Sequence, residues 1–249
     1  MSGEVIAQCS LLTASFNNQQ SKINNDLMLK VGLTGGIAAG KSVVGEAFVA
    51  LGAHLMQADR IAHALMQPGE AVYNEVVRHF GREILNPDLS VNRARLAELA
   101  FGPAVANQGE RAARVQELNR IVHPAVVRSQ DEWMEEIGRQ DPHAVAMVEA
   151  ALILEAGAKN HFDRLIVVTC NCEQRAERFA ARQKIDLETA RREVARRMAA
   201  QLSDEEKVKA ADFVIDNSGL LDETREQVRT VWEKLRAEAS AEYRVPSTE

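Results

Sequence analysis

The sequence predicts an α/β fold, a parallel β-sheet flanked by helices, on three observations. Short apolar runs alternate with helical periodicity along most of the chain, as in folds where helices connect parallel strands. A cluster of glycines separates the first apolar run from the first helical segment. The chain has 249 residues, 46% of them apolar, enough for one large domain or two small ones with a core of aliphatic side chains.

The first elements are read from the apolar pattern. Residues Leu29–Leu33 form an apolar run that predicts a buried strand. Lys41–Leu51 predicts a helix with one apolar face, which Gly52 ends. His54–Met56 predicts a second, short strand. Residues 60–142 read as mostly helical, with no confident strand.

Strand patterns return in the second half of the chain. Strands are predicted at Ala144–Val148, Leu165–Thr169 and Phe213–Ile215, and an amphipathic helix at Leu220–Ala239. A charged helical stretch covers 173–202, where Asp186 can cap one helix. Ser203 and Glu206 form a capping-box pattern for the next helix. The polar segment 1–28 is expected to be a disordered extension, and 239–249 a frayed tail.

Charge and cysteine content narrow the partners and the compartment. The net charge of −6 argues against nucleic-acid binding, which favours basic domains. No apolar stretch approaches the roughly 20 residues that span a bilayer, so no membrane partner is expected. Cys9, Cys170 and Cys172 are too few for a disulfide framework, which favours the cytoplasm. The C-x-C of Cys170 and Cys172 lacks the further ligands of a zinc site.

The glycine-rich segment fits the P-loop pattern G-x-x-x-x-G-K-[ST] at every fixed position. Its predicted nucleotide-binding residues are Gly35, Gly36, Ile37, Ala38, Ala39, Gly40, Lys41, Ser42 and Val43. Glycines let backbone N–H groups approach phosphate oxygens, the lysine supplies positive charge, and the serine hydroxyl can bind Mg²⁺. The fold class is therefore a P-loop NTPase-type parallel sheet, with ATP as the expected phosphoryl donor and Mg²⁺ as its cofactor. Val43 stands where a second hydroxyl is common.

Several P-loop functions compete. A GTPase switch is disfavoured because Asp216–Gly219 lies far beyond the loop and no N-K-x-D follows. The run AVAMVE ends in Glu149, which suits a carboxylate near Mg²⁺, although a surface position at the strand end fits as well. A small-molecule kinase has more support, and one that acts on a nucleoside, nucleotide or sugar stays open within that class. A different class, a non-catalytic nucleotide-binding module that regulates a partner, stays open.

Two further features favour a kinase. Asp59 is expected to end the second strand, where it can orient a substrate hydroxyl, or else cap a helix that begins at Arg60. Arginines crowd the stretch 173–202 and could neutralise a transferring phosphoryl group from a lid, which we place at about 178–205. We favour Arg182 first, then Arg178 and Arg197, and expect most of the others to lie on a solvated face.

With these pieces in order, the chain resembles the dephospho-CoA kinase family from about Leu29 to Leu235. The resemblance rests on VGLTGGIAAGKS, the acid at Asp59, QPGEAVYNEVVRHFGREIL, SVNRARLAELAF, LNRIVHPAVV, AALILEAG, QRAERFAARQ…RRMAAQ and ADFVIDNSG. It implies phosphoryl transfer from ATP to the ribose 3′-hydroxyl of dephospho-CoA. It also implies a domain over 29–238, with a core (29–59 and 143–238), a helical CoA-side insertion (60–142) and the lid.

The resemblance also assigns residues by position. Asp59 matches the acid that activates the hydroxyl, Arg93 and His123 match the acceptor side, and Arg178 and Arg182 match lid arginines. Asn217 lies near where adenine is held. On residue type alone, His123 before a proline reads as a packed helix-start residue and Arg93 as a solvated one.

Three positions depart from the family pattern. Gln57 replaces the first acid of D-A-D, Ala151 takes a frequent proline position, and Leu89 takes a common glycine position after Asp88, which puts that turn in doubt.

Overall fold

The structure, a computed structural model, describes residues 28–101 and 108–241. The chain divides into two compact units. Unit 1 comprises Met1–Met56 and Met134–Glu249, and unit 2 comprises Gln57–Trp133. Almost all of the expected N-terminal extension, and the tail from residue 242, lie outside the described residues.

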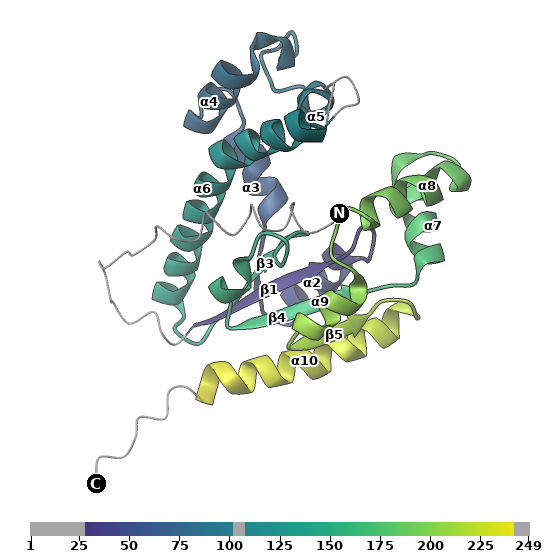
Figure 1. The fold of residues 1–249 in the computed structure, drawn as a ribbon. Helices are drawn as coiled ribbons and strands as arrows, with labels where there is room; N and C mark the ends of the chain where they lie inside the picture. Colours follow the sequence, from purple (N-terminus) through teal and green to yellow (C-terminus); the bar gives the residue numbers. More distant parts are fainter. Residues whose placement is uncertain (1–27, 102–107, 242–249) are drawn as a thin grey trace. The chain divides into compact units, whose positions relative to one another are not determined.

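One or more helices lie between successive strands along the chain (Figure 1). They are β1 (Leu29–Gly35), α2 (Lys41–Ala50), β2 (His54–Gln57), α3 (Ala58–Leu65), α4 (Ala71–Phe80), η2 (Arg82–Ile84), α5 (Arg93–Phe101), α6 (Gln108–Gln140), β3 (Val145–Glu149), η3 (Ala158–His161), β4 (Arg164–Thr169), α7 (Cys172–Gln183), α8 (Leu187–Met198), α9 (Asp204–Ala210), β5 (Phe213–Asp216) and α10 (Leu221–Ala241). No helix in the described part of the chain has an apolar stretch long enough to cross a membrane.

Five strands form one sheet in the order β2-β3-β1-β4-β5, so the first strand lies at the centre. β1 runs parallel to both β3 and β4, and β4 runs parallel to β5. The predicted α/β class is confirmed, and each predicted strand is present with ends shifted by at most two residues. The register pairs Leu33 with Glu149 and Gly35 with Val168, which brings these strand ends to one edge of the sheet.

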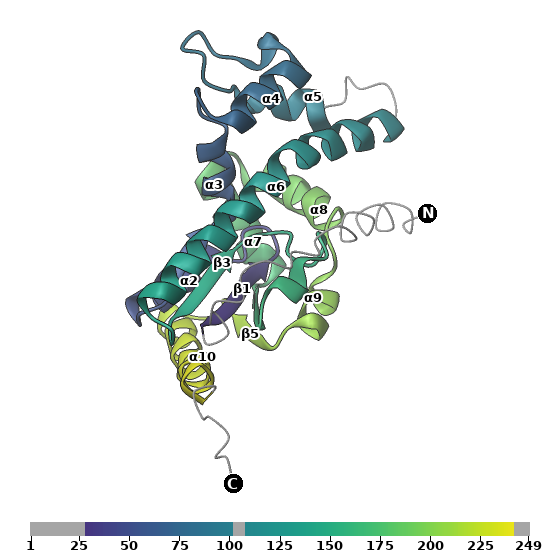
Figure 2. The ribbon, with the colours of Figure 1, turned by 90° about the vertical axis from the view of Figure 1, so that its left-hand side faces the viewer.

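The two faces of the sheet carry separate parts of the core. On one face, Val44 and Phe48 of α2 pack with α10 residues such as Leu235 against alternate residues of the central strands. The other face carries a cluster built around Ile153, Leu165 and Val167. Both views show α10 beside the sheet in unit 1 (Figures 1 and 2). The central strands are covered on both faces, which is why they read as continuous apolar runs.

Unit 2 has its own apolar core. Val72, Val76 and Phe80 of α4 pack with Ile84 and Leu96, and side chains of α6 lie against them. Among the described residues of this unit, strand pairing is limited to an isolated bridge between Leu85 and Val91. The turn between them forms although a leucine stands at the glycine position, and Leu89 adopts a positive φ of 68°.

Of the three N-terminal caps considered from the sequence, two are confirmed. Asp186 accepts a hydrogen bond from the Thr189 N–H at the start of α8, and Ser203 and Glu206 form the predicted capping box of α9. The predicted helix start at Arg60 is wrong. α3 begins at Ala58 with Gln57 as its N-cap residue, so Asp59 lies inside the first turn and does not cap the helix.

Candidate active site

The glycine-rich loop lies between β1 and α2, at the carboxyl end of the central strand. At Gly35 a Cβ atom would stand 2.3 Å from the carbonyl oxygen of Val168 in β4, a distance that excludes any side chain. Gly40 has a φ of 93°, and a Cβ there would stand 2.0 Å from Nδ2 of Asn217. Both glycines are therefore required by the path of the backbone.

α2 begins directly after this loop, at Lys41. The first N–H groups of a helix have no partner within the helix and carry partial positive charge, so they favour an anion. The Lys41 side chain folds back over the loop. Its Nζ donates to the carbonyl oxygens of Gly35 at 3.0 Å and Gly36 at 3.3 Å. A lysine ammonium is thus held beside N–H groups that suit phosphate.

The predicted metal-binding pair, Ser42 and Glu149, is brought together by the sheet. Ser42 follows Lys41 in α2, Glu149 ends β3, and Ser42 Oγ donates to Glu149 Oε1 at 3.0 Å. Two oxygen ligands beside a phosphate-binding loop fit Mg²⁺, which takes few protein ligands and completes its shell with phosphate and water. Within residues 28–101 and 108–241 no group of three His, Cys, Asp or Glu side chains could hold a metal without such help.

Arg178 and Asn217 converge on the carbonyl oxygen of Ala39 in the loop. Asn217 is buried and its Nδ2 donates to Ala39 O at 2.9 Å, while Arg178 Nη1 donates to the same oxygen at 3.4 Å. Arg178 Nη2 also donates to the backbone oxygen of Asn217 at 2.9 Å. Thr224 Oγ1 donates to Oδ1 of Asn217 at 3.1 Å, which fixes the orientation of the amide. Two residues 39 positions apart in sequence thus meet at one point of the loop.

α7 and α8 form the arginine-rich hairpin seen beside the sheet (Figure 1). Its apolar seam, Phe179, Ala190 and Val194, packs against Ile37 and Ala38 of the loop. The predicted helical stretch over 173–202 consists of two helices, separated at Lys184, which takes a left-handed φ of 56°, and the second begins after Asp186 as expected.

The guanidinium groups of Arg182 and Arg197 both lie over the Phe179 ring, with centroid distances of 5.6 and 5.2 Å. Arg197 also pairs with Glu193, and Arg196 binds the same carboxylate, so hydrogen bonds from both guanidinium groups lower the pKa of Glu193 to about 2. Arg182 is exposed, and its guanidinium lies over the ring of Phe179, which packs against the loop.

Arg175 is buried, whereas the sequence predicts that most arginines of this stretch lie on a solvated face. Its side chain is 0% exposed, whereas the neighbouring arginine Arg191 sits on the surface and pairs with Glu173. Sequence reasoning missed Arg175 because it treated the arginines of this stretch as one group. The available signal was spacing, since Arg175 lies one turn before Phe179 on the apolar side of α7.

The acceptor-side candidates all lie in unit 2. Asp59 and Arg93 are exposed, in the first turns of α3 and α5. His123 is exposed within α6, and the helix continues through Pro124, so the expectation of a helix-start histidine is wrong. Asp59 itself lies two residues beyond the end of β2 and does not end that strand.

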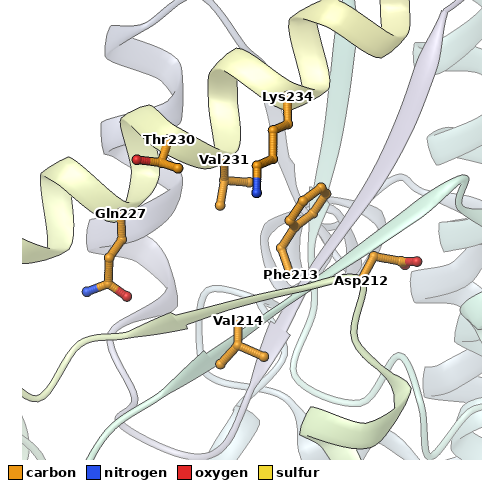
Figure 3. Close-up of a pocket in the computed structure, with 7 residues that line it drawn as sticks. All are labelled: Asp212, Phe213, Val214, Gln227, Thr230, Val231 and Lys234. Carbon is orange, nitrogen blue, oxygen red and sulfur yellow. The ribbon is translucent and has the colours of Figure 1, made fainter.

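A surface hollow of about 310 Å³ lies between β5 and α10 (Figure 3). Its lining residues are Asp212, Phe213, Val214, Gln227, Thr230, Val231 and Lys234. None of the sequence-predicted site residues lines it, and it adds nothing to the chemistry of the loop.

A parallel sheet whose central strand leads through this loop into a helix defines a P-loop nucleotide-binding protein. A family model described as dephospho-CoA kinase matches residues 29–223. The chain therefore belongs to the dephospho-CoA kinase family.

Individual relatives agree with this family. The chain is 36% identical over 209 residues to the dephospho-CoA kinase of Leifsonia xyli, covering 84% of this chain and 100% of the relative. It is 38% identical over 207 residues to that of Geobacter metallireducens, covering 83% and 96%. Among solved structures, TT1252 from Thermus thermophilus superimposes with a TM-score of 0.67 at 28% identity, covering 83% of this chain and 97% of that one. The dephospho-CoA kinase of Campylobacter jejuni shares the fold, with a TM-score of 0.53 at 23% identity over 84% and 98% of the two chains.

Proposed function

We propose that this chain transfers the γ-phosphoryl group of ATP to the ribose 3′-hydroxyl of dephospho-CoA. The new bond joins the 3′-oxygen to phosphorus, the bond from phosphorus to the β–γ bridging oxygen breaks, and the hydroxyl proton leaves to a base or water. The products are CoA and ADP. The observation that carries the proposal is the loop of unit 1, with Lys41 folded over it and Ser42 held against Glu149, in a chain of this family.

On the donor side, the loop amides and Lys41 hold the phosphate tail. Because charge on the γ-phosphoryl oxygens grows in the transition state, a fixed ammonium lowers the barrier more than it strengthens binding of the ground state. Ser42 and Glu149 would hold Mg²⁺, which neutralises charge on the β- and γ-phosphates when bound.

The α7–α8 hairpin is proposed as the lid. Its exposed Arg182 can reach a phosphate without breaking an ion pair, whereas Arg197 is already paired with Glu193. Arg178 is proposed to bind ATP as a second lid arginine, and Asn217 to lie near the adenine; both donate to Ala39 O and so lie beside the loop.

On the acceptor side, Asp59 is proposed to orient the 3′-hydroxyl, and Arg93 and His123 to bind dephospho-CoA, with unit 2 as the acceptor region. These roles rest on position in the family pattern. The cytoplasm remains the predicted compartment, since three cysteines are too few for a disulfide framework. Nucleic acid and membrane remain unexpected partners.

An acceptor-dependent ADP-release assay tests the function. Purified chain with ATP and Mg²⁺ should release ADP with dephospho-CoA, and far less with a panel of nucleosides, sugars and shikimate. Equal release with a sugar or nucleoside would reassign the acceptor. ATP binding with no acceptor-dependent release would favour a regulatory nucleotide-binding module.

Asp59→Asn tests the hydroxyl-orienting role. The variant should keep ATP affinity, because the loop is unchanged, and lose most of its turnover, on the order of 10²-fold or more as expected for a lost general base. Arg60→Gln is the matched control on the same turn. Turnover near that of the wild type in Asp59→Asn would remove the residue from the reaction.

A further inference from the structure

Arg175 is a fully buried cation that ties three parts of unit 1 together. Nε donates to the carbonyl oxygen of Cys170 at the end of β4, at 2.8 Å. Nη2 donates to Oδ2 of Asp204, in the first turn of α9, at 2.5 Å. A charge removed from water is tolerated when it is paired and hydrogen-bonded, and these two bonds meet part of that need.

The third nitrogen of this guanidinium lies against the phosphate-binding loop. Nη1 has no hydrogen-bond partner among the described residues, and it stands 2.1 Å from where a Cβ of Gly36 would be. The φ of Gly36 lies outside the left-handed range that L-residues avoid. A side chain at Gly36 would therefore have to push the Arg175 guanidinium aside, whereas the backbone conformation there would accept one.

α9 is anchored at a second point, one turn further along the helix. Lys207 is 1% exposed and its Nζ lies 3.0 Å from Oε1 of Glu155, in the segment after β3. The Glu155 carboxylate also accepts a hydrogen bond from the N–H of Leu202 at 3.1 Å. The helix that follows the hairpin is thus tied to the segment after β3 by Lys207, and to the loop region by Asp204 and Arg175.

We propose that Arg175 is a positioning residue for ATP, which sets the path of the phosphate-binding loop by filling the space above Gly36. The guanidinium, held by Asp204 and Cys170, keeps the loop in the form whose N–H groups receive phosphate. The inference rests on the proposed binding of ATP to this loop. Arg175 does not touch the reacting atoms, and it acts through Gly36.

A double-mutant cycle on nucleotide binding tests this directly. Wild type, Gly36→Ala, Arg175→Met and the double variant are compared by calorimetric titration with ATP and Mg²⁺ in the absence of acceptor. When Arg175 is present, the new methyl group of Gly36→Ala must displace the guanidinium, so this variant should weaken ATP binding about tenfold. With Arg175→Met already present, the same methyl group should cost little further affinity.

Steady-state kinetics separate positioning from general destabilisation. Arg175→Met should raise KM for ATP about tenfold and leave KM for dephospho-CoA unchanged, and Arg175→Lys should recover part of the loss because it keeps the charge. Arg191→Met, which removes an exposed arginine of the same hairpin, should change neither constant. Lys207→Met should lower stability without changing ATP affinity, because Lys207 pairs with Glu155 and does not contact the guanidinium beside Gly36.

Either of two results would overturn the inference. One is unchanged ATP affinity in folded Arg175→Met, and the other is strictly additive losses in the cycle. Wild type that binds no ATP would instead overturn the proposed function, so the two failures are distinguishable. If Arg175→Met does not fold, the pair Gly36→Ala and Arg175→Lys gives the same comparison.

Discussion

At the scale of single residues, left-handed backbone positions show where a side chain carries a cost. Glycine occupies most of them, but Ala38, Leu89 and Lys184 adopt positive φ values of 53°, 68° and 56°. Leu89 closes a turn in which its N–H donates to Asn86 O at 3.0 Å and its carbonyl oxygen accepts from the Tyr73 hydroxyl at 2.7 Å. Both hydrogen bonds involve backbone atoms of Leu89. The residue is 51% exposed, and its side chain contributes to neither bond.

Leu89→Gly should therefore stabilise unit 2. The left-handed conformation costs a non-glycine residue roughly 1–2 kcal/mol, and the extra flexibility of glycine in the unfolded chain offsets part of the gain, leaving about 0.5–1 kcal/mol. Urea unfolding compares the variants. Leu89→Ala keeps the Cβ and should show no gain, and an equal gain in both variants would contradict the argument from φ.

The two cysteines around Asn171 should differ in reactivity. Burial raises the pKa of the Cys170 thiol, and the nearby Arg178 and Arg175 guanidinium groups oppose that shift only in part. Cys172 is exposed. Because the thiolate is the reactive form, iodoacetamide at pH 8 should modify Cys172 well before Cys170. Peptide mass spectrometry measures both rates, and faster labelling of Cys170 would show that the pocket around it opens.

At the scale of elements, the α7–α8 hairpin combines an inner seam that packs on the loop with an outer face of ion pairs. Phe179 joins the two, since its buried ring lies in the seam and beneath two guanidinium groups. Exposed pairs of this kind contribute little individually, so the hairpin is held by its apolar seam and by the inward-facing Arg175 and Arg178, which donate to Asp204 and to Ala39 O.

Glu193 makes the contribution of α8 to folding stability depend on pH. Hydrogen bonds from Arg196 and Arg197 lower its pKa from 4.5 to about 2. A carboxylate with a lowered folded-state pKa stabilises the fold fully above its ordinary pKa, and that contribution disappears as the pH falls from about 4.5 through 2. Carboxyl NMR titration should place Glu193 near pH 2.

The matched variants test the cause of that shift. Arg196→Gln and Arg197→Gln should each move the Glu193 titration upward, toward the ordinary value. The stability difference between wild type and Glu193→Gln should be present at pH 7 and shrink below pH 4. A titration that stays near pH 2 in both arginine variants would assign the shift to another group.

At the scale of the whole molecule, the P-loop and the proposed acceptor-side residues belong to different units. The loop, Glu149 and the arginine hairpin lie in unit 1, and Asp59, Arg93 and His123 lie in unit 2. Each unit has its own apolar core. Each also has one of the two tryptophans, Trp232 in unit 1 and Trp133 in unit 2.

ADP should therefore stabilise unit 1 by mass action. In a Trp133→Phe background, Trp232 fluorescence reports the unfolding of unit 1. ADP at 100 times its Kd should raise the unfolding free energy by about 2.7 kcal/mol. Lys41→Ala should lose most of this gain at the same ADP concentration, because the loop loses its cation. Undiminished stabilisation in that variant would remove Lys41 from the nucleotide site.

Local pattern predicted the strands, the loop and two helix caps, because each depends on residues close in sequence. Examples are the glycine-rich segment that leads to Lys41 and the capping box at Ser203. The start of α3 was misjudged, because Gln57 is a weak capping residue by type and the chain turns there without a side-chain hydrogen bond. Leu89 was doubtful for a related reason, since hydrogen bonds from other parts of unit 2 hold its unfavourable φ.

The sequence by itself determined the class of fold, the phosphate-binding loop and the family, since these follow from periodicity and from an ordered set of local motifs. Only the tertiary structure decided which of seven similar arginines is buried, and that Ser42 meets Glu149 and Asn217 meets Ala39. The physical reason is that burial and long-range hydrogen bonds depend on strand register and helix packing, which bring together residues more than a hundred positions apart.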